Sequence, residues 1–199
     1  MPILPSLKLT PSLCIDHNAE IRSLIKHNQL ECDFLHGTRS STLAKMMSKD
    51  IDDAVKGCLL SQRMMRDYLH QSPQSGCYLL SGIDGLAERG GDTVSTVSKD
   101  EGKVAVHYAR ISSTRLPDSF PLIFGIKNDK NLSITEVIVQ DDYLEEIFID
   151  HTVKNKIPPQ NITAILAPVN EANALRELCF NNTLSHTKII EYPHITSDD

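Results

Sequence analysis

Polar side chains that could hold or activate a small molecule occur at three points of the chain, and the first is His36-Gly37-Thr38. This triplet follows the apolar pair Phe34-Leu35, which predicts that it ends a short strand. A glycine allows a ligand to approach the backbone closely, and its N–H and C=O can then hydrogen-bond a planar amide. The flanking imidazole and hydroxyl would add polar contacts. The alternative is an ordinary turn, because a single histidine is more often a surface or core residue than a ligand-binding one.

A carboxylate that could stabilise positive charge is Glu136, inside the apolar strand pattern of residues 134–139. With a period of two, Glu136 shares a face with isoleucines, and a carboxylate there is costly unless it is paired or functional. The alternative is a charge that protects an edge strand from further pairing. Glu145 and Glu146 are rival carboxylates. Because they are adjacent on a predicted strand, they point to opposite faces, and we expect both to face solvent.

The third point joins Ser95-Thr96, in a strand of small hydroxyl residues, to Tyr108 on the helix that follows. Together they could line a polar cleft, with the Tyr108 ring either in the core or stacked on a ligand. Other sites lack their motifs: there is no GxSxG elbow, GxGxxG turn or P-loop. The five cysteines are scattered without a CxxC pair, which indicates reduced thiols and no zinc or other metal site.

The composition is that of a soluble globular domain with 40% apolar residues, a formal charge of −6 and no Trp. A chain of 199 residues can bury about 70% of its unfolded surface without disulfides or a metal. The negative charge, with no long run of Lys or Arg, argues against nucleic acid as a partner. The first ten residues do not resemble a signal peptide, and no stretch approaches the ~20 apolar residues of a membrane span.

The elements that would position these residues predict an α+β fold, because helical patterns dominate the first half and strand patterns the second. We expect an N-terminal arm and helix over residues 1–30, the helix being capped by Asp16 and ending near Asn28. A single domain is expected over residues 31–199, with a helical insert over residues 40–72. Within the insert, apolar residues at helical spacing predict a helix from residue 43 to 60 and beyond. Further predictions are strands over residues 31–35, 93–97, 120–126, 134–139, 143–149, 162–167 and 188–190, and helices over 104–109 and 169–179.

In this order the motifs resemble the catalytic domain of ADP-ribosyltransferases, in the branch shared by diphtheria toxin and the poly(ADP-ribose) polymerases. That family opens with a strand ending in His-Gly-Thr or His-Gly-Ser, as in Leu35-His36-Gly37-Thr38. A small-residue strand and an A-x-x-Y-A helix follow, which fit residues 92–97 and Ala105 to Ala109. A later strand carries the catalytic glutamate before branched apolar residues, as Glu136 does. The resemblance implies a split mixed β-sheet core.

The resemblance also implies the chemistry: an NAD-dependent mono-ADP-ribosyltransferase that modifies a protein, with NAD as co-substrate. Glu136 and His36 would be the catalytic residues, with Glu136 stabilising the oxocarbenium-like transition state as nicotinamide leaves. His36, Gly37, Thr38, Ser95, Thr96 and Tyr108 would bind NAD. A bacterial effector or toxin fits this reading, cytoplasmic or secreted to act on a host-cell protein.

Two features depart from the family. The residue two before Glu136 is Ile134, not Glu or Gln, which argues against typical modification of arginine. The nicotinamide-stacking tyrosine of the branch has no counterpart on the strand over residues 93–97, so Tyr78 or Tyr108 could supply the ring. The alternatives are a non-catalytic interaction module on the same fold, an NAD glycohydrolase, or a hydrolase of another class that uses His36 with Asp or Glu.

Overall fold

The computed structural model describes residues 15–61, 64, 93–98, 101–114, 116, 118–141 and 146–196. In this part of the chain the helices are α1 (His17–His27), α2 (Ser40–Met46), α5 (Gly102–Thr114) and α6 (Ala172–Phe180), with a 3-10 turn, η2 (Pro159–Asn161). The strands are β1 (Phe34–Arg39), β2 (Leu59–Leu60), β3 (Thr93–Ser98), β4 (Pro121–Ile126), β5 (Ile134–Asp141), β6 (Glu146–Lys154), β7 (Lys156–Ile157), β8 (Ile162–Ala167) and β9 (Lys188–Glu191).

Seven of these strands form one sheet in the order β5-β6-β3-β1-β4-β8-β9, and β2 pairs with β7. The sheet is mixed, because β8 and β9 are parallel while the other neighbours are antiparallel. The predicted mixed sheet, preceded by an N-terminal helix, is therefore confirmed.

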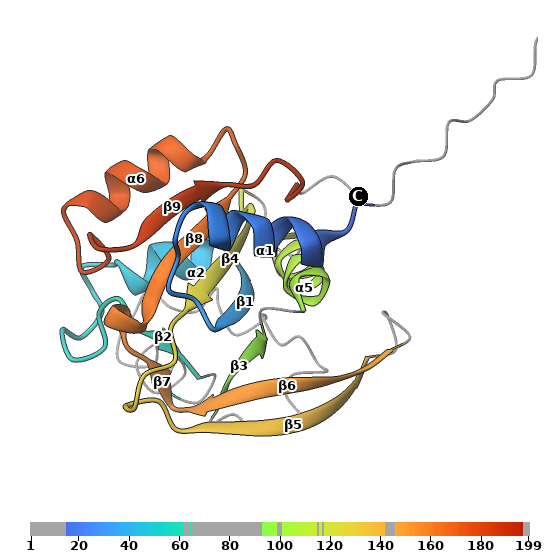
Figure 1. The fold of residues 1–199 in the computed structure, drawn as a ribbon. Helices are drawn as coiled ribbons and strands as arrows, with labels where there is room; N and C mark the ends of the chain where they lie inside the picture. Colours follow the sequence, from blue (N-terminus) through green and yellow to red (C-terminus); the bar gives the residue numbers. More distant parts are fainter. Residues whose placement is uncertain are drawn as a thin grey trace, which may run out of the picture.

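The sheet is joined in its middle by a short ladder. β1 and β3 pair only at Phe34↔Ser98 and Leu35↔Val97, whereas β1 pairs with β4 along its whole length. One half consists of β5, β6 and β3, and the other of β1, β4, β8 and β9. In Figure 1 the long β5–β6 ribbon lies along the lower border and crosses the direction of β4 and β8.

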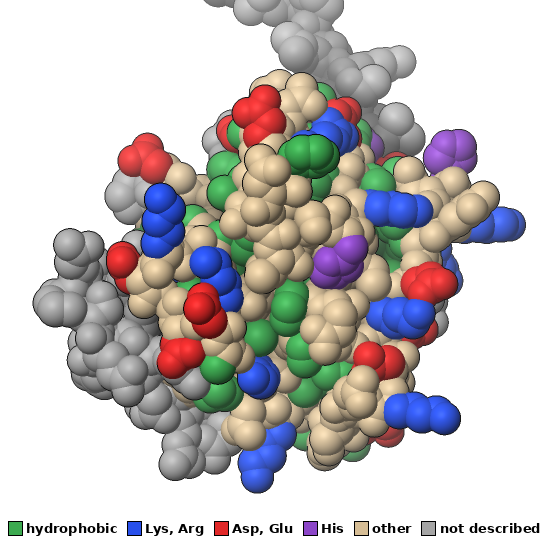
Figure 2. Space-filling view, turned by 90° about the vertical axis from the view of Figure 1, so that its left-hand side faces the viewer, with side chains coloured by type: hydrophobic (Ala, Val, Ile, Leu, Met, Phe, Trp, Pro, Cys, Tyr) green, Lys and Arg blue, Asp and Glu red, His purple; other side chains and the backbone are tan. Residues whose placement is uncertain are grey.

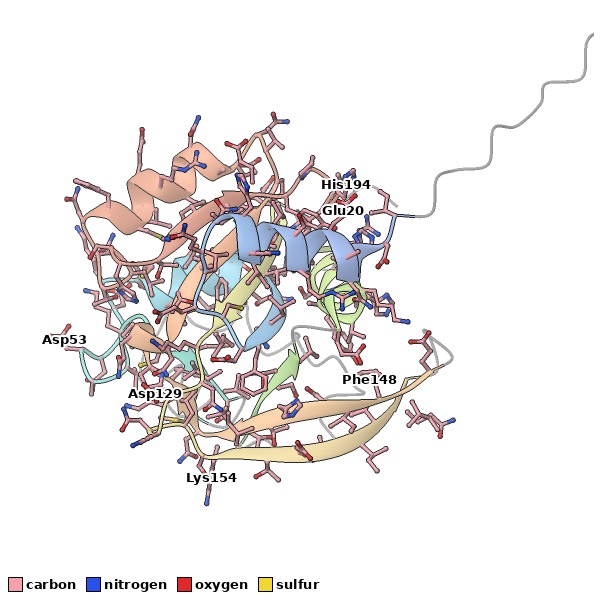
Figure 3. The ribbon with its side chains drawn as sticks, in the orientation of Figure 1. Glu20, Asp53, Asp129, Phe148, Lys154 and His194 are labelled. Carbon is pink, nitrogen blue, oxygen red and sulfur yellow. The ribbon has the colours of Figure 1, made fainter. Side chains whose placement is uncertain are left out.

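Two hydrophobic cores cover the two faces of the sheet. On the face covered by α1 and α5, here called the α5 face, Leu35, Val97 and Phe148 pack against these helices. Figure 3 shows Phe148 on the side of β6 that points toward α5. On the opposite face, here called the α2 face, Phe124 and Leu122 pack with side chains from α2 and α6.

Helix α1 is tied to the C-terminal segment by a polar cluster. The Nδ1 atom of His17 lies 2.6 Å from the hydroxyl of Tyr192, and the Nε2 atom of His194 lies 3.2 Å from a carboxylate oxygen of Glu20. Burial raises the pKa of Tyr192, so the phenol stays protonated while it shares this hydrogen bond with the imidazole. Glu20 and His194 lie side by side in Figure 3, where α1 meets the end of the described chain.

The helix predicted from residue 43 to 60 and beyond is wrong in its length. α2 ends at Met46, turns follow, and Leu59–Leu60 is a strand. Several apolar residues of this stretch are nevertheless buried, among them Met47, Val55 and Cys58. Gly57 has a φ of 73°, which a helix does not tolerate. Of the predicted insert over residues 40–72, the part after Ser61 lies outside the described residues, Met64 excepted.

Two strand boundaries also differ from the prediction. His36-Gly37-Thr38 lies inside β1 and does not follow it, and the strand predicted over residues 143–149 is β6, which runs from Glu146 to Lys154. The predicted N-cap of α1 is confirmed, because the Asp16 carboxylate accepts a hydrogen bond from the N–H of Ala19.

The surface carries both charge signs. On the side shown in Figure 2, acidic and basic side chains are interspersed and neither sign forms a broad patch. Among the described cysteines, Cys32 is buried, and Cys58 and Cys179 are buried thiols. Within the described residues, no helix is long and apolar enough to cross a membrane.

Candidate functional site

Four polar residues form a row across the α2 face of the sheet. Glu136 on β5 pairs with His151 on β6, and His151 pairs with Thr96 on β3. The register between β1 and β3, extended by one residue past Leu35↔Val97, brings His36 opposite Thr96. Directly paired residues of antiparallel strands point to the same face, so all four side chains project to one side. The row spans three strand spacings, about 14 Å from His36 to Glu136.

His36 occupies the place where the ladder between β1 and β3 ends. Its Nδ1–H donates to the carbonyl oxygen of Ser95, so a side chain replaces the backbone bond that the diverging strands no longer make. Burial of the ring lowers the pKa of His36 to about 4, although this hydrogen bond opposes the shift. The imidazole is therefore neutral near pH 7, with Nε2 as a hydrogen-bond acceptor and not an acid.

Glu136 is the exposed end of the row. Its carboxylate oxygen lies 3.4 Å from the Nε2 atom of His151, and its side chain is 73% exposed. The carboxylate thus contacts His151 on one side, and its exposed side can accept a hydrogen bond from a ligand hydroxyl. The strand context predicted for it is present, since Ile134 on the same face packs against the core.

His151 was not singled out from the sequence, yet it connects Glu136 to the interior. Its ring lies 4.9 Å from the ring of Phe34, centroid to centroid, and its side chain is 14% exposed. The buried Nδ1 atom has no hydrogen-bond partner among the residues that the structure describes. A signal did exist: the residues of β6 that share this face are Ile147, Ile149, His151 and Val153. A lone polar group in such a pattern marks either a paired or a functional residue.

The backbone beneath His151 is fixed from both sides. The hydroxyl of Thr96 donates to the carbonyl oxygen of His151 at 2.6 Å. The backbone N–H of His151 donates to a carboxylate oxygen of Asp150 at 2.8 Å. Thr96 and Asp150 are both almost fully buried. The middle of the row is therefore buried and fixed by these bonds, which holds the positions of His36 and Glu136 on either side of it.

Gly37 is required by packing on the α5 face. A Cβ there would lie 2.1 Å from the carbonyl oxygen of Ala105 and 2.7 Å from the amide nitrogen of Ala109. This contact gives a structural reason for both the glycine and the two alanines of the A-x-x-Y-A pattern. Thr38 is buried and pairs with Leu122, whose side chain is on the α2 face with that of His36.

Three other predicted residues are not brought into the row. The Ser95 side chain belongs to the α5 face, and only its carbonyl oxygen reaches His36. Tyr108 is on α5 and packs against the core of the α5 face, behind the sheet as seen from His36. Glu146 is also on the α5 face and forms an ion pair with Lys103, Nζ to carboxylate 2.6 Å. Glu145 and Tyr78 lie outside the described residues.

The chemistry open to this row is hydrogen bonding and charge stabilisation. A neutral imidazole at one end and a carboxylate at the other can both accept bonds from ligand hydroxyls. Groups of three or more His, Cys, Asp or Glu that could hold a metal ion are absent from the described residues.

Comparison with known proteins adds no assignment: no protein-family model matches the sequence, and no curated protein matches it either.

Proposed function

We propose that this protein is an NAD-dependent mono-ADP-ribosyltransferase that modifies a protein. The observation that supports the proposal is the row itself. His36 and Glu136 are 100 residues apart in sequence, and the resemblance assigns both to one NAD site. They project from the same sheet face, one from each half of the sheet. Had they faced opposite sides, no single ligand could touch both.

In this proposal His36 and Thr38 bind the adenosine-side ribose, and the backbone of Gly37 holds the nicotinamide amide. The ladder between β1 and β3 ends before Gly37, so β3 does not pair with this part of β1. Glu136 accepts a hydrogen bond from the 2′-hydroxyl of the nicotinamide ribose. Its negative charge then stabilises the oxocarbenium-like transition state as the glycosidic bond breaks, which is electrostatic and positional catalysis.

We therefore revise the roles of three residues to which the resemblance gave direct contacts with NAD: Ser95, Thr96 and Tyr108. Thr96 lies beneath the ligand between the two ends of the row. Ser95 acts through its carbonyl oxygen by fixing the tautomer of His36. Tyr108 supports β1 from behind and does not stack on nicotinamide.

The decisive experiment compares two matched substitutions, Glu136→Gln and Glu146→Gln, in a reaction with labelled NAD and candidate acceptor proteins. We expect Glu136→Gln to lower NAD cleavage and protein labelling by about 10²-fold or more. Glu146→Gln should retain both, because Glu146 pairs with Lys103 on the other face.

The products separate the alternatives. Labelled protein identifies a transferase, and free ADP-ribose without labelled protein identifies a glycohydrolase. Unchanged cleavage and labelling by Glu136→Gln would contradict the assignment of this carboxylate. If neither labelled protein nor free ADP-ribose forms with any acceptor, the protein does not cleave NAD, and the enzyme proposal is wrong.

A further inference from the structure

Strand β5 forms one edge of the described sheet. The exposed charge of Glu136 is one protection against further pairing, but the other usual protections of an edge strand are missing. The strand pairs with β6 in an unbroken register, from Ile134↔Val153 to Asp141↔Glu146, without a bulge. Its eight residues include no Lys, Pro or Gly. Long, regular edges without such residues readily accept another strand, which is why most proteins avoid them.

The α2 face of the β5–β6 ribbon is also apolar and exposed. Ile138 is 80% exposed, Ile147 71% and Ile149 51%. Ile138 and Ile149 are directly paired, so they form a contiguous apolar surface that reaches the free edge of the sheet. Isoleucines exposed to this extent, beside an edge of the described sheet that has no neighbouring strand, indicate a contact surface.

We propose that a second copy of this chain pairs with β5 in antiparallel fashion about a two-fold axis at Ile138, so that one sheet continues through both copies. The sequence of β5 is self-complementary about this residue. Ile138 meets Ile138 of the second copy, Val137 meets Val139, and Glu136 meets Gln140. Pairs of β-branched residues stabilise antiparallel ladders, and the Gln amide can donate to the carboxylate.

Neighbouring registers are less favourable. A two-fold axis at Val137 would place Glu136 opposite the apolar Ile138, and an axis at Glu136 would bring the two carboxylates together. Like charges directly opposite each other destabilise a ladder. The axis at Ile138 instead extends the isoleucine surface, in the order Ile149, Ile138, then Ile138 and Ile149 of the second copy.

This pairing also adds a residue to the candidate site. His151, Glu136 and Gln140 of the second copy would follow one another across three neighbouring strands on the α2 face. Gln140 would then hold the side of Glu136 that His151 does not. The proposed dimer does not depend on whether Glu136 takes part in catalysis. The effect of Gln140 on NAD cleavage, in contrast, rests on the proposed function.

The test measures the association of the full chain by sedimentation velocity over a wide range of concentrations. We expect the wild-type chain to dimerise. Ile138→Lys and Ile138→Glu should each weaken the dimer by about tenfold or more, because like charges then face each other at the axis. A mixture of the two variants should restore a heterodimer, since Lys then faces Glu.

Phe180→Lys is the matched control, because Phe180 is 76% exposed at the end of α6, away from β5. It should leave the dimer unchanged. Circular dichroism of each variant verifies that the fold is retained. A wild-type chain that remains monomeric overturns the proposal. The β5 edge would then bind a different protein or no protein. A dimer insensitive to both Ile138 variants, or a mixture that does not associate, overturns the assigned register.

The contact to Glu136 is tested in the dimer with Gln140→Ala, which should lower NAD cleavage severalfold. Full cleavage by a dimeric Gln140→Ala variant overturns this contact. If the dimer forms as predicted but no variant and no wild-type sample cleaves NAD, the proposed function fails while the interface stands.

Discussion

At the scale of single residues, the protonation of His36 governs both the candidate site and the response of the fold to acid. In the unfolded chain His36 binds a proton below about pH 6.5, whereas in the folded protein burial holds its pKa at about 4. The unfolded state therefore binds more protons between these values. Stability contributed by the neutral ring is complete above pH 6.5 and is lost as the pH falls toward 4, by up to about 3 kcal/mol.

We predict that His36→Gln flattens this pH dependence, measured as the free energy of unfolding in urea between pH 7 and pH 4. The exposed His27 on α1 supplies the control, and His27→Gln should follow the wild-type curve. Part of the wild-type slope will persist in both variants, because burial and Arg110 also lower the pKa of His17. Parallel curves for His36→Gln and the wild type would show that this ring is not kept neutral by the fold.

At the scale of elements, the closest contact is that of β1 with α5 at Gly37. We predict that Gly37→Ala destabilises the protein by about 3 kcal/mol, because the new methyl group would overlap backbone atoms of Ala105 and Ala109. Truncating either alanine cannot relieve an overlap with the backbone, so the helix must move. Urea unfolding measures the loss.

Gly125→Ala is the control for this prediction. Its Cβ would meet the Cys32 sulfur at 3.1 Å and the Ala164 methyl at 3.2 Å, side-chain atoms that can shift slightly. We expect a clearly smaller loss. Equal losses for the two glycines would argue that β1 and α5 separate at little cost.

The same elements show what the sequence could and could not predict. Strands β4, β5, β8 and β9 were found because branched apolar residues mark them and turn residues bound them. The long helix over residues 43–60 was wrong, because regular burial of Met47, Val55 and Cys58 is also produced by turns over a core. Spacing records which side chains are buried but not the backbone path between them.

The sequence pointed to some residues of the candidate site but not to the contacts between them. His36 was singled out because it opens a His-Gly-Thr triplet after a predicted strand, and Glu136 because it is charged within an apolar strand pattern. Strand pairing, however, is a long-range property, so the sequence did not reveal that His151 lies beside Glu136 or that Glu146 pairs with Lys103. The position of Tyr108 relative to the row depends on which face of the sheet α5 covers. Local sequence patterns do not determine which face a helix covers.

At the scale of the whole molecule, the candidate site spans both halves of the sheet, which are joined at only two residue pairs between β1 and β3. His36 belongs to one half and Glu136 to the other. A ligand that touches both ends of the row would hold the halves together. In the proposed mode the nicotinamide mononucleotide part contacts both halves, through Gly37 and Glu136, whereas the AMP part contacts only the half that contains β1. Added as separate molecules, the two parts also lack the covalent link that combines their binding energies.

We therefore predict that NAD raises the thermal unfolding midpoint, whereas AMP and nicotinamide mononucleotide added together raise it much less. At a hundredfold excess over its Kd, NAD should add about 2.7 kcal/mol of stability. His36→Gln and Glu136→Gln should each weaken this effect, and Glu20→Gln, in the cluster on α1, should not. This measurement needs no turnover, so it detects a non-catalytic NAD-binding module as well as an enzyme. Equal stabilisation by NAD and by AMP alone would mean that the ligand contacts only the half of the sheet that contains β1, and Glu136 would then lie outside the NAD site.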